Sequence, residues 1–171
     1  WFQMDRGADA WVIVKEAVDT GALVTIRSAC DRRLLTERNR PQRYLRETVR
    51  KGKSVSHLWI DVPAAPGRSA RRAHLVLRWR RVVLEMIDQR TARRYYPTMW
   101  GVDVVEHGTV PDGEESISWH LLTTWEVTSA VDAQLVVRGY STRWRIEEFH
   151  RTWKGGGCHV EDTQLRQRAR I

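Results

Sequence analysis

The stretch 140-YSTRWRIEEFHRTWK-154 repeats its polar residues at the spacing of a helix. At about 100° per residue, Tyr140, Arg143, Glu147 and Lys154 lie within about 60° of one another around a helical axis. One face would therefore present a carboxylate among a phenol and two cations. Such a face predicts a helix that mounts a rigid group for chemistry.

Apolar residues of the same stretch fall on the other side of the predicted helix. Ile146, Phe149 and Trp153 follow the i, i+3, i+7 rule of a buried stripe. We expect this stripe to pack against a core while the polar face points outward. The helix should span residues 129–154, with a serine or threonine as its cap and three glycines after it.

The order Tyr, two residues, Arg, three residues, Glu, six residues, Lys resembles the signature of the insertion-sequence-four family of bacterial DDE transposases. Four residue types at three set gaps make a specific signal. Two more segments are similar to parts of that family, namely Asp5-Arg-Gly-Ala-Asp9 and the WHLLTT run at 119–124. The resemblance is weakest over residues 31–115.

The resemblance implies that Asp5 is the second aspartate, and Glu147 the glutamate, of the family's Asp-Asp-Glu triad. Phosphoryl transfer on DNA uses two divalent cations about 3.5–4 Å apart, and carboxylates suit Mg²⁺. The complete enzyme would then hold two Mg²⁺ or Mn²⁺ ions on these residues. The alternatives are a turn-forming Asp5 and a solvated Glu147 paired with Arg143 or Arg151.

Several cations match DNA-contacting positions of the resembled family. Tyr140, Arg143 and Lys154 match residues that hold phosphates around the scissile bond, and Arg151 stands where relatives tolerate a basic residue. Guanidinium and ammonium groups position the DNA backbone without reading its sequence. Arg27 also matches a basic contact, although a lone arginine at a strand end is more often simply exposed.

Two tryptophans have both a DNA-binding and a structural interpretation. Trp119 matches a family tryptophan that stacks on a flipped base, and such stacking contributes about 1–3 kcal/mol. A core aromatic in a strand is an equally supported interpretation of Trp119. Trp144 lies at the edge of the polar face and can line a DNA channel or a core. Asp9 can cap a helix or bind metal.

The charge of the chain favours a polyanionic partner. Twenty-nine Lys and Arg against 21 Asp and Glu give a net charge of +8 and a pI near 10.2. The excess of arginine suits bidentate phosphate contacts, although a GC-rich genome would produce the same bias. We expect double-stranded DNA, as transposon ends and as target, to be the partner.

No membrane or secretion signal is visible in this sequence. It has no 18-residue apolar run and no basic segment followed by an apolar one. Cys30 and Cys158 show neither zinc nor disulfide spacing, which favours a reducing compartment. We expect a cytoplasmic, nucleoid-associated bacterial protein.

Hydrophobic patterning predicts an α/β fold. Residues 1–30 have the order strand, helix, strand, which indicates a βαβ unit with Asp5 after the first strand, where open α/β sheets place their chemistry. Residues 55–125 alternate between apolar and polar, which indicates antiparallel strands. With the resemblance, we predict a partial ribonuclease-H-like catalytic core over 1–171, with a mixed sheet and helices, and an antiparallel β insertion before the last helix.

The first aspartate of such a core precedes the second by a whole strand or more, whereas this sequence begins four residues before Asp5. We therefore expect a piece of a longer enzyme that is inactive alone and whose full-length form is a homodimer. The predicted function is metal-dependent cut-and-paste DNA transposition, with strand nicking and strand transfer at transposon ends. The alternative is a catalytically inactive, basic DNA-binding remnant, and nicking of end-containing DNA separates the two.

Overall fold

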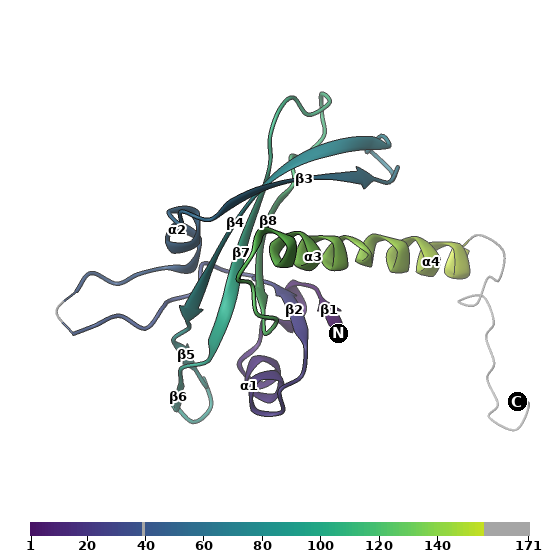
Figure 1. The fold of residues 1–171 in the computed structure, drawn as a ribbon. Coiled ribbons are helices and arrows are strands. Elements are labelled where there is room, and N and C mark those ends of the chain that lie inside the picture. The colour runs from purple at the N-terminus through teal and green to yellow at the C-terminus, as the bar shows by residue number, and fades with distance from the viewer. Residues whose placement is uncertain (39, 156–171) are drawn as a thin grey trace, which may run out of the picture. The chain divides into compact units, whose positions relative to one another are not determined.

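The computed structural model describes residues 1–38 and 40–155. The chain divides into two compact units, Trp1–Tyr140 and Ser141–Ile171. The first unit contains a six-stranded sheet and three helices, and the second contains one described helix (Figure 1). The fold is therefore a mixed α/β fold with few helices, and each unit is described by itself.

The first part of the chain forms the predicted βαβ unit. Strand β1 (Phe2–Met4) leads through a short 3-10 turn (Arg6–Ala8) to helix α1 (Trp11–Asp19) and strand β2 (Val24–Arg27). The two strands pair in parallel, with Met4 opposite Ile26. The sequence-based expectation of a parallel pair is confirmed.

The middle of the chain forms the long antiparallel strands that alternation predicted. Strand β3 (Val55–Val62) alternates between exposed and buried along its whole length. The other elements are α2 (Leu45–Arg50), β4 (Arg71–Val83), β7 (Thr98–Glu106), β8 (Ser118–Thr123) and a hairpin of β5 (Met86–Ile87) and β6 (Arg94–Tyr95). The strand order is β1-β2-β8-β7-β4-β3, so these strands continue the sheet of the βαβ unit.

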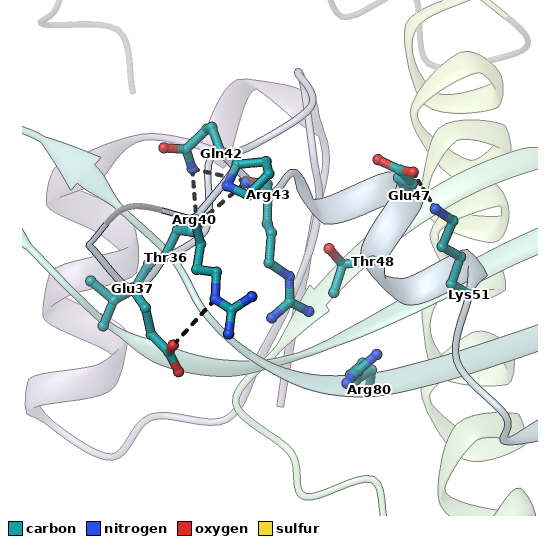
Figure 2. A pocket seen from close by; sticks show the side chains of 11 residues that line it. Thr36, Glu37, Arg40, Gln42, Arg43, Glu47, Thr48, Lys51 and Arg80 are labelled. Carbon is teal, nitrogen blue, oxygen red and sulfur yellow. Dashed lines mark hydrogen bonds and ion pairs between the residues drawn. The ribbon is translucent and has the colours of Figure 1, made fainter.

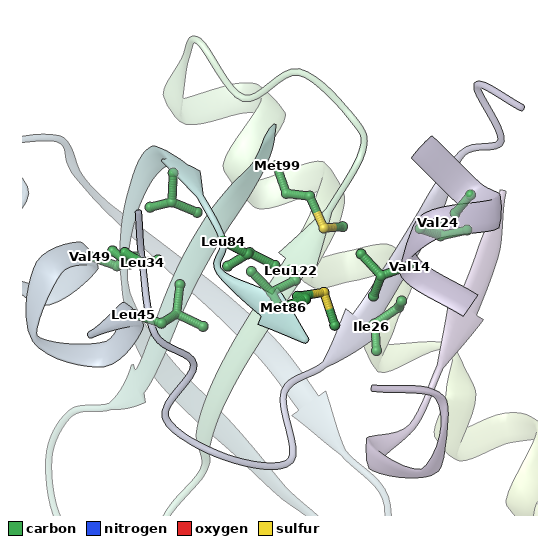
Figure 3. Close-up of a cluster of buried hydrophobic side chains, with 12 residues drawn as sticks. Val14, Val24, Ile26, Leu34, Leu45, Val49, Leu84, Met86, Met99 and Leu122 are labelled. Carbon is green, nitrogen blue, oxygen red and sulfur yellow. The ribbon is translucent and has the colours of Figure 1, made fainter. Parts of the chain in front are cut away.

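Apolar side chains are buried on both faces of this sheet. On one face, α1 and α2 contribute Val14, Leu45 and Val49 to a core that Ile26 and Leu122 complete from the strands (Figure 3). The opposite face is covered by α3 (Ala130–Ser141). That helix buries Ala133, Val136, Val137 and Tyr140, a stripe at i, i+3, i+4 and i+7.

Helix α3 begins with a reciprocal cap. The Ser129 hydroxyl accepts from the Asp132 backbone N–H at 3.2 Å, and the Asp132 carboxylate accepts from the Ser129 N–H at 2.9 Å. This is a capping-box arrangement. The hydrogen bonds from Ser129 and Thr128 hold the pKa of Asp132 below its usual value. A cap at this position agrees with the sequence-based expectation.

The single helix expected over 129–154 is wrong. A turn at Thr142 separates α3 from α4 (Arg143–Gly155). Tyr140 therefore belongs to the buried stripe of α3, with 3% of its surface exposed, and not to an outward polar face. The reason is that Tyr140 continues the i, i+3, i+4, i+7 stripe that Ala133 begins on α3, so its side follows from the apolar residues before it.

The buried apolar stripe expected on this helix is also wrong. Ile146, Phe149 and Trp153 are 55%, 63% and 43% exposed. Phe149 and Trp153 stack on each other with ring centroids 6.4 Å apart. Helical spacing does place such residues on a common side, but burial requires a partner that the pattern alone does not supply.

A polar contact ties α1 to the β5–β6 hairpin. The Tyr95 hydroxyl donates to Asp19 Oδ1 at 2.9 Å, and Lys15 also bonds Asp19. Burial, followed by the bond to Asp19, raises the pKa of Tyr95 to about 12. The bond from Lys15, followed by that from Tyr95, lowers the pKa of Asp19.

In the described part of the chain, no helix has both the length and the apolarity that a membrane crossing requires.

At Gly101, α2 packs closely against the sheet. A Cβ at this position would lie 2.7 Å from Val49 Cγ2 and 3.1 Å from Leu45 Cδ1. We predict that Gly101→Ala lowers the free energy of unfolding by about 1–3 kcal/mol, because α2 must shift to admit the methyl group. Urea unfolding measures this. Gly7→Ala is the control, because a Cβ there meets no atom within 4 Å, and equal losses in both variants would contradict the packing argument.

Candidate active site and nucleic-acid contacts

Asp5 lies immediately after β1, at the carboxyl edge of the parallel pair formed with β2. Its side chain is exposed, and its backbone carbonyl accepts from the Ala8 N–H at 2.9 Å, which closes the turn that follows. This turn directs the chain into α1 and leaves the Asp5 side chain at the sheet edge. The location is the one that open α/β folds use for binding and chemistry.

Asp9 has a structural role that neither sequence-based alternative described. Its buried carboxylate accepts from the Ser28 hydroxyl at 3.0 Å and the Ala29 N–H at 2.7 Å, and it pairs with the Arg32 guanidinium at 2.7 Å. The residue before α1 in the cap position is Ala10, and Asp9 makes no cap bond. Asp9 thus fastens the segment after β2 to the segment after β1.

Arg27 is the last residue of β2 and is half-buried. Its guanidinium lies 3.4 Å from the Ser118 carbonyl oxygen of strand β8. Arg27 is one residue before Ser28, which bonds Asp9, so the Asp9 contacts also position this cation at the same sheet edge as Asp5.

Trp119 and Tyr140 pack against each other in the core. Trp119 is 5% exposed, and its ring meets Tyr140 edge-on with centroids 5.1 Å apart. Trp119 is therefore a core aromatic in this structure, which was the second interpretation from the sequence. Tyr140 is buried, whereas the sequence predicted that it would be exposed. A DNA contact by either residue stays a prediction, and it requires the residue to leave this core.

The other candidate residues lie on α4, in the second unit. Arg143 and Trp144 are half-buried. The backbone of α4 carries Glu147, Arg151 and Lys154, but their side chains lie outside the described part of the structure. The predicted convergence of Asp5 and Glu147 on shared metal ions therefore stays a prediction.

The described residues supply only part of the predicted metal site. Among them, no group of three His, Cys, Asp or Glu side chains is placed to hold a metal ion. Asp5 fits the role of one ligand, because it is an exposed carboxylate at a sheet edge and hard cations prefer carboxylate oxygens. Cys30 is exposed and a free thiol.

The sequence analysis missed a buried charged cluster under α2. Asp103 on β7 is 3% exposed, and its Oδ1 lies 2.8 Å from Nδ1 of His120, its cross-strand neighbour on β8. Arg50 Nε lies 3.5 Å from the other carboxylate oxygen. An aspartate inside the otherwise apolar strand was the signal available, because buried carboxylates need partners.

We predict that Asp9→Ala lowers the free energy of unfolding by about 3 kcal/mol, because it leaves the Arg32 guanidinium and buried donors unpaired. Chemical denaturation measures the loss. Asp112→Ala removes the same charge from an exposed loop and should change stability by less than about 0.5 kcal/mol. A small effect at Asp9 would show that the cluster does not hold these segments together.

Trp119→Ala should lower the free energy of unfolding by about 3–5 kcal/mol, because a buried indole is lost from the core. Thermal unfolding followed by circular dichroism tests this. Trp59→Ala is the matched control, since Trp59 is half exposed on β3. If Trp119→Ala left stability intact and only weakened binding to DNA with unpaired bases, Trp119 would be a base-stacking residue.

A comparison with known families adds an independent finding. A family model described as the transposase DDE domain matches residues 30–171. The match runs from the segment anchored by Asp9, through α2 and the antiparallel strands, to the end of the chain. It covers well over half of the sequence, and the chain therefore belongs to the transposase DDE domain family.

Proposed function

We propose that this chain contributes to metal-dependent cut-and-paste DNA transposition, as part of a DDE transposase that nicks DNA at transposon ends and transfers the strand. The observation that carries this proposal is the position of Asp5. It is an exposed carboxylate directly after β1, at the carboxyl ends of the parallel strands β1 and β2. Membership of the DDE family supplies the reaction class, DNA transposition. Together they support a chemical role for the end of β1 at Asp5.

Nicking is hydrolysis of a phosphodiester. A water oxygen forms a bond to phosphorus, the bond from phosphorus to the 3′ oxygen breaks, and the 3′ oxygen leaves as a hydroxyl. In strand transfer that hydroxyl becomes the nucleophile toward a second phosphodiester. Asp5 and Glu147 would hold the divalent ions, which supply activation of the attacking oxygen and stabilisation of the leaving one.

Basic side chains would hold the DNA backbone. Arg27, at the Asp5 edge of the sheet, and Arg143, Arg151 and Lys154, on α4, are the proposed phosphate contacts, with Trp144 beside them. A net charge of +8 favours association with a polyanion of any sequence. These residues would set position along the DNA without selecting bases.

The spacing of Tyr140, Arg143, Glu147 and Lys154 supports a place in the insertion-sequence-four branch. The turn at Thr142 divides these four residues between α3 and α4. In the proposed enzyme, Tyr140 therefore anchors the end of α3, while Arg143 begins the helix that carries the glutamate.

The test is a nicking assay on DNA that contains transposon ends, with Mg²⁺ and with Mn²⁺. It uses the chain alone and the chain joined to a homologous N-terminal strand that carries an aspartate. We predict that Asp5→Asn and Glu147→Gln each reduce nicking at least 1,000-fold, in whichever of these two proteins nicks DNA. This loss is expected when a metal ligand is removed. Neither change removes a phosphate contact, so DNA affinity should not fall.

Glu148→Gln is the matched control for Glu147→Gln, because it removes the same charge from the adjacent position. It should leave nicking within a few-fold of the parent. Metal-dependent nicking that survives both Asp5→Asn and Glu147→Gln would place the active site elsewhere. DNA binding without nicking in either form would favour the alternative, an inactive DNA-binding remnant.

A further inference from the structure

Two adjoining hollows open beside α2 in the first unit. The first has a volume of about 570 Å³ and lies between residues 35–37 and 40–43, α2 and β4 (Figure 2). The second, of about 510 Å³, lies between the segment after α2 and the end of β4. Both are lined by Lys51 and Arg80, so the two hollows adjoin, and we call them together the Arg80 groove.

Cations dominate the lining of the Arg80 groove. Six exposed basic side chains line it, namely Arg40, Arg43, Lys51, Lys53, Arg80 and Arg81. The acidic lining residues are Glu37 and Glu47. Figure 2 shows the guanidinium groups of Arg40 and Arg43 extending side by side into the first hollow. The groove therefore carries an excess of positive charge.

The two acids are already engaged with cations of the groove. Glu37 Oε2 lies 3.9 Å from Arg40 Nε, and Glu47 Oε1 lies 2.5 Å from Lys51 Nζ. The bond from Lys51 lowers the pKa of Glu47, so this carboxylate stays ionised and paired. These acids thus leave the other cations of the groove uncompensated.

Four cations of the groove have no carboxylate partner among the residues that the structure describes. They are Arg43, Lys53, Arg80 and Arg81. Like charges gathered in a concave surface repel one another and focus a positive potential outward. That potential is relieved when an anion enters the groove and releases its own counterions.

We propose that the Arg80 groove binds the phosphodiester backbone of duplex DNA, as a contact separate from the catalytic edge. This inference rests on the proposed function, which supplies DNA as the substrate. Exposed cations spread along two joined hollows suit a polymer with regularly repeated charges. A single free phosphate is instead favoured by converging, buried cations, whereas the six basic side chains of this groove are all exposed.

The register of the sheet relates the groove to Asp5. One row of paired residues crosses from β1 to β4 through Met4, Ile26, Leu122, Gly101 and Arg80. Four steps between strands at about 4.8 Å each separate Met4 from Arg80 by about 19 Å. At about 3.4 Å per base pair, DNA that reaches both Asp5 and the groove spans about six base pairs or more.

The test compares Arg43→Gln/Arg80→Gln with the control Arg90→Gln/Arg93→Gln. Both variants remove two positive charges from exposed positions, and the control positions lie in the β5–β6 turn. Binding of a 30-base-pair duplex is measured by fluorescence anisotropy over a range of salt concentrations. Circular dichroism confirms that both variants keep the parent fold.

We expect the groove variant to lower the slope of log affinity against log salt by about two, because each lost phosphate contact removes about 0.9. At moderate salt its affinity should fall at least tenfold, while the control keeps the parent slope. Equal slopes in the two variants would overturn the proposal. Loss of inorganic phosphate binding by the groove variant, with the DNA slope unchanged, would also overturn it.

Failure of this proposal and failure of the proposed function give different results. If Asp5→Asn and Glu147→Gln do not affect nicking but the groove variant loses salt slope, the catalytic assignment falls and the groove stands. If nicking depends on Asp5 and Glu147 while the groove variant binds DNA as the control does, the groove proposal alone falls.

Discussion

The pairing of β2 with β8 is the contact on which the rest of the first unit depends. Thr25 lies opposite Thr123, and their hydroxyls are 3.2 Å apart. The Thr123 hydroxyl is also 2.7 Å from the Val24 carbonyl oxygen, and the Thr124 hydroxyl accepts from the Val24 N–H at 2.9 Å. Residues about a hundred positions apart are thereby joined into one sheet, which gives Asp5 and the Arg80 groove a common rigid frame.

Much of the acidic charge in this frame is used internally. Asp9 holds Arg32, and Glu106 and Glu114 both pair with the largely buried Arg71. Such pairs fasten loops to strands, and their desolvation limits how much they add to stability. Because these carboxylates are turned inward, the outward-facing arginines of the Arg80 groove keep most of their positive potential.

Local patterning predicted the strands well, because each strand depends on the alternation of apolar and polar residues along its own length. Strand β3 begins at Val55, where the predicted antiparallel segment begins, and the parallel βαβ unit follows from a helix that separates two short strands. The prediction of one helix over 129–154 was wrong for a related reason. A spacing rule assumes one unbroken axis, and the turn at Thr142 ends α3 before Arg143 begins α4.

The sequence by itself determined which segments form strands and helices, the family resemblance and the candidate carboxylates. These features depend on residue type and short-range spacing. Only the tertiary structure decided that Trp119 and Tyr140 pack together, that Asp9 binds Arg32, and that Arg43 and Arg80 line one groove. Those contacts join residues from 21 to 37 positions apart through sheet register and loop closure. No periodicity along the chain encodes such distances, because they arise only when the strands pair and bury their shared faces.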